Sequence, residues 1–194
     1  MHLPSLACWL VVLGAGSACA AGEVSVEAAR KGEFIEVRAH ALIEAPIGIV
    51  WDTLTDYERL PEFIPGLKKS RLVSRRGASV IVEQSGEARF LMFSFPIDVT
   101  LEALEFPRSS IRVRALSGNF RHFEGGYHLE PEPGSNRIAL RWVGTIIADM
   151  SLPPLIGEVV MRKRIEDQFV GMVREIERRE SLRRGQDVPA VPAK

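Results

Sequence analysis

The stretch WDTLTDYERLPEFIPGLKKSRLV, residues 51–73, decides the fold because three kinds of local structure follow one another within it. Its first residues complete a helical pattern over 45–56, whose apolar side chains recur on one face: Ile47, Val50, Trp51 and Leu54. Pro61 and Pro65 prevent a long continuation of that helix, so residues 57–63 are predicted to form one more short turn. Gly66 then releases the chain into a strand.

The same stretch carries acids and aromatic rings but no familiar catalytic signature. We expect it to pack short helices against the end of a sheet, with the Trp51 ring buried. Its acidic residues are interpreted as solvated or capping groups: Asp52, Asp56, Glu58 and Glu62. The stretch is therefore predicted to be architecture rather than an active site.

Outside this stretch, apolar and polar residues mostly alternate with a period of two, which is typical of half-buried strands. The predicted strands are 34–43, 67–76, 79–90, 93–106, 110–118, 120–132 and 137–148. The turns between the later strands are short, which favours antiparallel hairpins. Gly125-Gly126 is predicted to form a bulge.

A long helix is predicted over 155–180, after Pro153-Pro154. Its apolar stripe consists of Met161, Ile165, Phe169, Met172, Val173 and Ile176, and its opposite face carries Arg164, Asp167, Arg174 and Glu177. Strands that are separated from helices along the chain indicate an α+β fold. A sheet of this length twists and curls, and the last helix is the element long enough to cover its concave face.

Composition narrows the class of protein. The 194 residues are 46% hydrophobic and 26% charged, with 25 basic and 25 acidic residues, so the chain lacks the basic excess of a nucleic-acid-binding protein. Length and composition fit one domain with a sizeable core.

The two ends of the chain are set apart from this domain. Residues 1–20 combine an apolar run with Ala18-Cys19-Ala20, which predicts a cleaved secretory signal and an exported mature protein in the bacterial periplasm. A lipid anchor on Cys19 is the less favoured alternative. We expect residues 21–33 to be a mobile lead-in, 34–180 the folded domain, and 181–194 a disordered tail.

A series of features follows in order through the first part of the domain: a strand that ends in a small residue and Pro, a Val-Trp helix, an acidic-aromatic pair, a Pro-aromatic pair, and Pro-Gly before the next strand. Its residues are 43–46 (IEAP), Val50-Trp51, 54–57 (LTDY), 60–66 (LPEFIPG) and Lys69-Ser70. Together with the order of elements over 34–180, this pattern resembles the START-like (Bet v 1-like, or SRPBCC) superfamily, and in it the polyketide cyclase/dehydrase and Coq10-type branch.

The resemblance implies a helix-grip fold: a curved sheet around the long helix, with a hydrophobic cavity between them. It also implies binding of lipids, quinones, sterols or polyketides, because members include carriers and enzymes. If the strand phases hold, the cavity is lined by Gln84, Phe93, Phe95, Ile97, Val99, Ile111, Val113, Tyr127, Leu140, Trp142, Phe169, Met172 and Val173. Gln84, Tyr127 and Trp142 would supply its polar groups.

We therefore expect non-catalytic binding or transport of a hydrophobic small molecule. One alternative is an enzyme similar to polyketide cyclases and aromatases, and another is a protein-interaction module with a filled core. The apolar segment Leu152, Pro153, Pro154, Leu155 and Ile156 precedes the basic residues 162–164 and is a candidate gate or membrane contact.

Neither a metal site nor a catalytic cluster is predicted. His2 leaves with the signal, and His40, His122 and His128 are interpreted as solvated strand histidines. No serine lies in a nucleophile motif and no glycine-rich loop could cradle a phosphate, so no cofactor is expected. The sequence leaves the oligomeric state and the identity of the ligand open.

Overall fold

The computed structural model describes residues 24–90, 93–148 and 154–186. Eight strands form one antiparallel sheet in the order β1-β2-β8-β7-β6-β5-β4-β3. The strands are β1 (Ser25–Lys31), β2 (Phe34–Ile43), β3 (Leu67–Arg76), β4 (Ser79–Phe90), β5 (Phe93–Phe106), β6 (Ser110–Gly118), β7 (Phe120–Pro131) and β8 (Ile138–Ala148). The helices are α1 (Ile47–Leu54), the 3₁₀ turn η1 (Tyr57–Arg59), α2 (Leu60–Phe63) and α3 (Pro154–Gln186).

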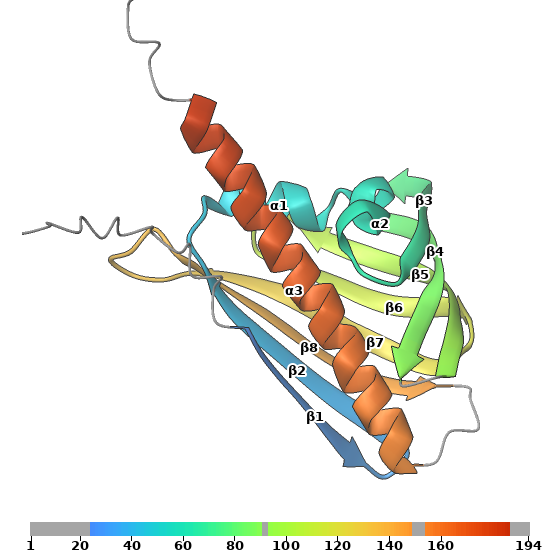
Figure 1. The fold of residues 1–194 in the computed structure, drawn as a ribbon. Helices are drawn as coiled ribbons and strands as arrows, with labels where there is room; N and C mark the ends of the chain where they lie inside the picture. The colour runs from blue at the N-terminus through green and yellow to red at the C-terminus, as the bar shows by residue number, and fades with distance from the viewer. Residues whose placement is uncertain (1–23, 91–92, 149–153, 187–194) are drawn as a thin grey trace, which may run out of the picture.

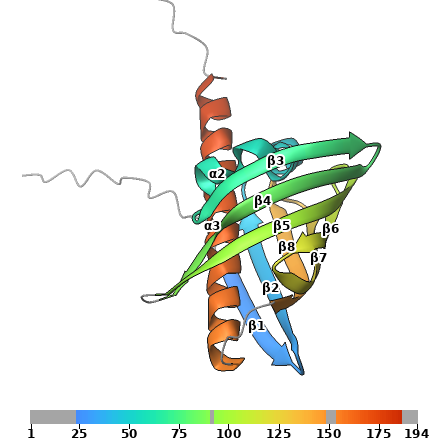
Figure 2. The same ribbon diagram turned by 90° about the vertical axis from the view of Figure 1, so that its right-hand side faces the viewer.

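The sheet curves around α3, which crosses its concave side, while α1 and α2 lie at the end of the sheet beside β3 (Figures 1 and 2). This arrangement confirms the predicted α+β helix-grip fold. The core lies between the sheet and the helix, and the predicted apolar stripe of α3 is buried throughout: Met161, Ile165, Phe169, Met172, Val173 and Ile176.

The N-terminal lead-in was expected to be mobile, but residues 25–31 form strand β1, which pairs antiparallel with β2 from Ser25↔His40 to Lys31↔Phe34. Gly32, at φ +64°, opens the tight turn between the two strands. Val24, Val26 and Ala28 pack against the core. The sequence does contain a sign of this strand, a short alternation of apolar and polar residues before a Lys-Gly turn. The pairing with β2 is a tertiary interaction, however, and no local pattern predicts it.

The boundary of the predicted C-terminal tail also requires correction, because α3 continues to Gln186 and residues 181–186 are helical. Arg183 and Arg184 both reach back one turn to Glu180, at N–O distances of 2.8 Å and 2.6 Å. Arg184 also approaches Glu44 at 3.4 Å. These ion pairs shield the Glu180 side chain, which is only 4% exposed, and they attach the last helical turns to the domain.

The stretch 51–73 folds into α1, η1, α2 and the start of β3, as its prolines and glycine predicted. Pro61 occupies the first turn of α2, and Gly66 has φ +77°. The Trp51 ring, however, is only partly buried, because α1 directs Val50, Thr53 and Leu54 to the interior. Asp56 is also more than a solvated group, since its carboxylate accepts a 2.7 Å hydrogen bond from Arg179 of α3.

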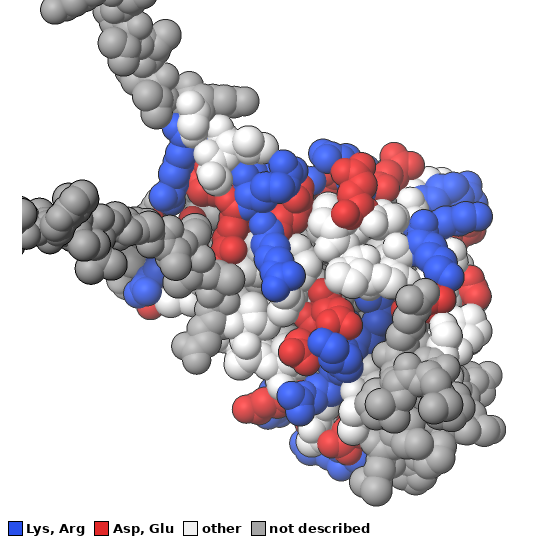
Figure 3. All heavy atoms as spheres, in the orientation of Figure 1, with Lys and Arg blue, Asp and Glu red and all other residues white. Residues whose placement is uncertain are grey.

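Opposite charges intermingle on the face of the molecule that carries α3 (Figure 3). Arg178 and Arg179 both contact Glu175 at 2.7 Å, so much of this charge is arranged in ion pairs along the helix. Of the helices that the structure describes, none has the length and apolar character needed to cross a bilayer.

Candidate ligand-binding cavity

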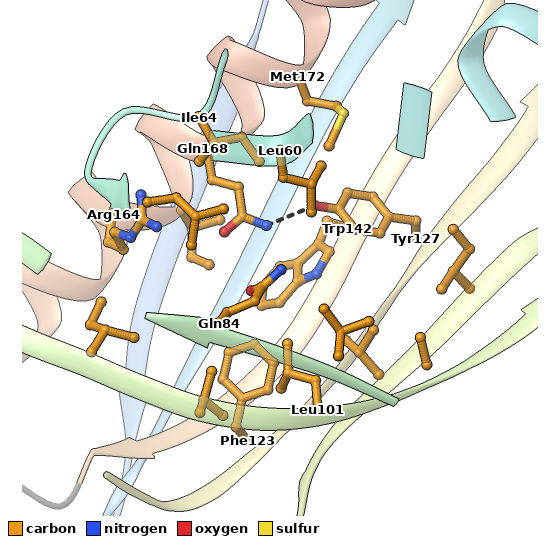
Figure 4. Close-up of a pocket in the computed structure, with 18 of the residues that line it drawn as sticks. Leu60, Ile64, Gln84, Leu101, Phe123, Tyr127, Trp142, Arg164, Gln168 and Met172 are labelled. Carbon is orange, nitrogen blue, oxygen red and sulfur yellow. Dashed lines mark hydrogen bonds between the residues drawn. The ribbon is translucent and has the colours of Figure 1, made fainter. Parts of the chain in front are cut away.

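A cavity of about 110 Å³ lies between α3 and the concave side of the sheet (Figure 4). The residues predicted from strand phase that the structure places in its wall are Gln84, Ile97, Val99, Ile111, Val113, Tyr127, Trp142 and Met172. They come from β4, β5, β6, β7, β8 and α3. The alternation within each strand therefore predicted correctly that the strand residues of this set face the concave side of the sheet, and the helical period predicted the position of Met172.

Four other predicted residues, Phe95, Leu140, Phe169 and Val173, are not part of the wall. Leu140, Phe169 and Val173 are fully buried in the core, where helix and sheet are in direct contact. Phe169 stacks on the Tyr127 ring with centroids 6.5 Å apart and an interplanar angle of 10°. Phe95 is partly buried against the core, and the side chain of Phe93 lies outside the described residues. A strand phase identifies a face of the sheet, but it does not tell where along that face the helix leaves space.

The helical segment, which we define as residues 47–64 with α1, η1 and α2, completes the wall together with Leu67 at the start of β3; its wall residues are Leu54, Tyr57, Leu60 and Ile64. Sequence reasoning treated this segment as architecture and did not include it in the cavity. The signal that could have found it is the recurrence of apolar or aromatic residues every three or four positions from Leu54 to Ile64. Other wall residues not predicted are Val82, Leu101, Ala103, Phe120, Phe123, Ile146, Met161, Arg164, Ile165 and Gln168.

Trp142 is the largest fully buried side chain, and two glycines make room for its ring. Gly144 pairs with Gly125 across β8 and β7. A Cβ atom on Gly144 would lie 2.4 Å from Cη2 of Trp142, and one on Gly125 would lie 3.0 Å from Cζ2. The indole therefore lies flat over a patch of sheet that carries no side chains.

This pairing corrects the predicted bulge at Gly125-Gly126, because the register of β7 with β8 is unbroken there. The irregularity lies instead between Phe120 and His122. Phe120 and Phe123 both line the cavity, and their rings meet at a centroid distance of 5.5 Å. An extra residue between them accounts for how side chains three positions apart reach the same face of one strand.

A hydrogen-bonded pair supplies polar groups on the α3 side of the cavity. The Gln168 Nε2 group donates to the Tyr127 hydroxyl at 2.9 Å (Figure 4). Burial raises the pKa of Tyr127, so its hydroxyl stays protonated at neutral pH. Gln84, on the opposite side, donates from Nε2 to Ser70 Oγ at 3.3 Å.

Tyr57 anchors the helical segment to the sheet rather than offering a free group to the cavity. Its hydroxyl donates to Oε1 of Glu105 at 2.9 Å, and Arg75 donates to the other carboxylate oxygen at 2.6 Å. Burial, and then the nearby Glu105 charge, raise the pKa of Tyr57 well above its ordinary value. The pair holds one wall of the cavity at a defined distance from β5.

Arg164 was expected on the polar face of α3, but it lines the cavity. Its guanidinium Nη1 donates to the carbonyl oxygen of Pro65 at 2.6 Å and so joins α3 to the loop before β3. One side of the helix faces the cavity, with residues at positions i, i+3, i+4, i+7 and i+11: Met161, Arg164, Ile165, Gln168 and Met172. The spacing was visible in the sequence, but the charge of Arg164 argued for the solvent face.

The other predicted features lie away from this wall. Leu152 and Pro153 of the candidate gate are outside the described residues, and Pro154–Ile156 form the first turn of α3 with side chains that are not described. His40 and His128 are exposed on strands, and Nε2 of His122 lies 2.9 Å from Thr145 Oγ1. Within residues 24–90, 93–148 and 154–186, no cluster of three or more His, Cys, Asp or Glu side chains could hold a metal ion.

Comparisons with solved structures place this geometry in a known fold. An aromatase/cyclase from Streptomyces sp. R1128 is 16% identical with a TM-score of 0.65, and the match covers 81% of this chain and 99% of that one. A STAR-related lipid transfer protein from Xanthomonas axonopodis is 12% identical with a TM-score of 0.66, and coverage is 79% and 93%. Human StAR-related lipid transfer protein 5 is 14% identical with a TM-score of 0.62, and coverage is 82% and 88%.

At these identities the likeness shows the fold alone. No protein among those with curated descriptions matches the chain. The family model described as polyketide cyclase/dehydrase and lipid transport matches residues 43–175, which is most of the chain. It does not single out the Coq10-type branch, which stays a prediction. The chain belongs to this polyketide cyclase/dehydrase and lipid transport family, within the START-like (SRPBCC) superfamily.

Proposed function

We propose that this protein binds and carries a hydrophobic small molecule, such as a lipid or a quinone, without transforming it. The observation that carries the proposal is the cavity under α3, whose wall is mostly aliphatic and aromatic with a few polar groups. Pockets for small molecules have this composition, in which apolar surface provides affinity and polar groups provide orientation. Each 100 Å² of apolar ligand surface removed from water contributes roughly 2.5 kcal/mol.

The cavity is too small to hold a lipid or a quinone in its present form. Its volume of about 110 Å³ is smaller than the roughly 300–1,000 Å³ of pockets for drug-sized ligands. It is also below the roughly 150 Å³ of an apolar cavity that holds benzene. A lipid or quinone must therefore widen the space by displacing α3 or the helical segment. The hydrogen bond from Arg164 to Pro65 joins these two elements, so it is expected to break when they separate.

Native mass spectrometry of protein purified from its own compartment tests the proposal directly, because a carried ligand appears as an added mass. Binding of lipids, quinones and an apolar dye to the purified protein provides the second measurement. Ala103 lines the cavity at 2% exposure, so Ala103→Leu is expected to fill part of it and weaken binding. The matched control is Ala29→Leu on the exposed side of β1, which should bind as the wild type does. Protein that carries no ligand and binds none of these probes would refute the proposal.

The second candidate is a cyclase or aromatase-like enzyme, which needs polar groups able to polarise a substrate carbonyl inside the cavity. The Tyr127–Gln168 pair and Arg164 are the observation that favours it. Incubation with a poly-β-keto thioester, followed by mass spectrometry, separates the two candidates. An enzyme would release a cyclised product that has lost water, and Tyr127→Phe would slow it, whereas a carrier returns the compound unchanged. The interaction-module alternative requires a filled core, and the cavity argues against it.

We also infer that the carrier acts after export, with residues 1–20 as a cleaved signal, and that the segment 152–156 gates the cavity or touches a membrane surface. The inference about export rests on the apolar run and the Ala-x-Ala pattern. The inference about the gate rests on the position of this segment at the start of α3, the helix that covers the cavity. Sequencing the N-terminus of the protein from its native cell tests export, and an intact Met1 would contradict it.

A further inference from the structure

Arg164 stands where the internal cavity meets the outer surface. Its side chain lines the cavity and also a groove on the outside of the molecule. The other walls of the groove are residues 65–68 at the start of β3, Glu87 of β4, and the α3 residues Val160 and Asp167. Leu67 is likewise shared by both spaces. The groove and the cavity therefore adjoin each other at Arg164 and Leu67.

The nearby carboxylate of Asp167 favours the charge of Arg164, but it does not form an ion pair with it. Within the described parts of the chain, no ion pair joins its guanidinium to an Asp or Glu side chain, and its hydrogen bond goes to the neutral Pro65 carbonyl. Asp167, one turn further along α3, is held by Lys163 at 2.7 Å. Other half-buried arginines of this helix differ, since Arg179 contacts both Asp56 and Glu175. A guanidinium has five N–H donors, so most of those on Arg164 remain for a ligand.

The guanidinium of Arg164 is partly removed from water, and this affects its pKa. Burial lowers the pKa of Arg164, and the nearby Asp167 charge offsets only part of this effect, so the site disfavours the guanidinium charge when no anion is bound. An anion placed against it would relieve this cost, because a charge that is out of water is stabilised by a paired, hydrogen-bonded opposite charge.

A second donor lies close by. Gln168, one helical turn from Arg164, donates to the Tyr127 hydroxyl oxygen, so the hydroxyl hydrogen of Tyr127 is left to point toward an acceptor. In Figure 4 the Gln168 amide lies between Arg164 and Tyr127 on the α3 side of the pocket. Both donors line the same cavity, whose other walls are mostly apolar and include Ile97, Val99 and Ile146.

We propose that the ligand is a carboxylate-bearing amphiphile, whose carboxylate is held by Arg164 and the Tyr127 hydroxyl at the cavity mouth and whose apolar body lies between α3 and the sheet. The planar fork of a guanidinium matches the two oxygens of a carboxylate, and such charge-assisted hydrogen bonds are stronger than neutral ones. The proposal rests on the proposed carrier function and adds the chemical class of the ligand. It also assigns Arg164 as the residue that determines this specificity.

The test compares octanoate with 1-octanol, two probes with the same chain and different head groups, by isothermal titration calorimetry at pH 7.5. The wild-type protein is expected to bind octanoate at least about tenfold more tightly than 1-octanol. Arg164→Met keeps an apolar stem but removes the charge, so it should abolish the preference and leave binding of 1-octanol largely intact. Arg162→Met, which removes a neighbouring exposed arginine of the same helix, is the matched control and should keep the preference.

The comparison on wild-type protein does not depend on whether a variant folds. Equal affinity for the two probes would overturn the assignment of a carboxylate ligand and leave the carrier function standing. Absence of binding for both probes and for the wider panel of lipids and quinones would overturn both proposals. A preference for octanoate that survives in folded Arg164→Met protein would refute the role of Arg164.

Discussion

Replacing Gly144 with alanine tests whether the Trp142 ring depends on the glycine pair beneath it. The new Cβ would lie 2.4 Å from Cη2 of Trp142 and 2.8 Å from the backbone oxygen of Glu124. Carbon atoms in good contact are about 3.5–4.0 Å apart, so the ring must move by more than 1 Å. Because Trp142 is only 2% exposed and packs near Phe123, it has little free space to move into. We expect a loss of about 3 kcal/mol in the free energy of unfolding, the upper end for overpacking.

Urea unfolding followed by circular dichroism measures this loss, and a double mutant identifies its origin. In a Trp142→Phe background the smaller ring leaves space, so Gly144→Ala should cost at least about 1 kcal/mol less than it does in the wild type. The contact with Glu124 remains, so the relief should be partial. Gly48→Ala is the control: no atom lies within 4 Å of its Cβ position in α1, and it should be neutral or stabilising by up to about 1 kcal/mol. A cost under about 0.5 kcal/mol for Gly144→Ala, or strict additivity in the double mutant, would refute the reasoning.

Two further predictions concern stability. Trp51→Ala should lower the free energy of unfolding by about 1–3 kcal/mol, because the Trp51 ring is only partly buried. This is less than the roughly 3–5 kcal/mol typical of a fully buried aromatic ring, and equal urea midpoints for Trp51→Ala and Trp142→Ala would contradict the expected difference. Hydrogen bonds from Arg178 and Arg183, supported by their neighbouring arginines, lower the pKa of Glu175 and of Glu180 from 4.5 to about 2. Their contribution to stability is therefore present above pH 4.5 and is lost as the pH falls toward 2. Glu175→Gln should flatten the pH dependence of the free energy of unfolding in that window.

Local patterns were sufficient for most of the fold. The period of two placed Ile97, Val99, Ile111 and Val113 on the concave face, and the helical period placed the α3 stripe against it. Both results follow from the backbone geometry of a single element, which directs side chains at fixed intervals whatever surrounds it. Pro61 and Gly66 likewise determine the local backbone through their own dihedral angles, so the sequence predicted where the helices begin and end.

The candidate site depends on contacts between elements that are far apart in the chain. Arg164 turns toward the cavity because Pro65, 99 residues earlier, presents a carbonyl oxygen to it. Gly125 and Gly144 both leave space for the Trp142 ring because the pairing of β7 with β8 places them opposite each other. Strand β1 forms because β2 offers it an edge with which to pair. Sequence alone determines which face of each helix or strand is apolar, since that is a property of local geometry. Where those faces meet closely, and where they leave the space that a ligand could occupy, is set by long-range packing, which depends on the shapes of all the side chains at once.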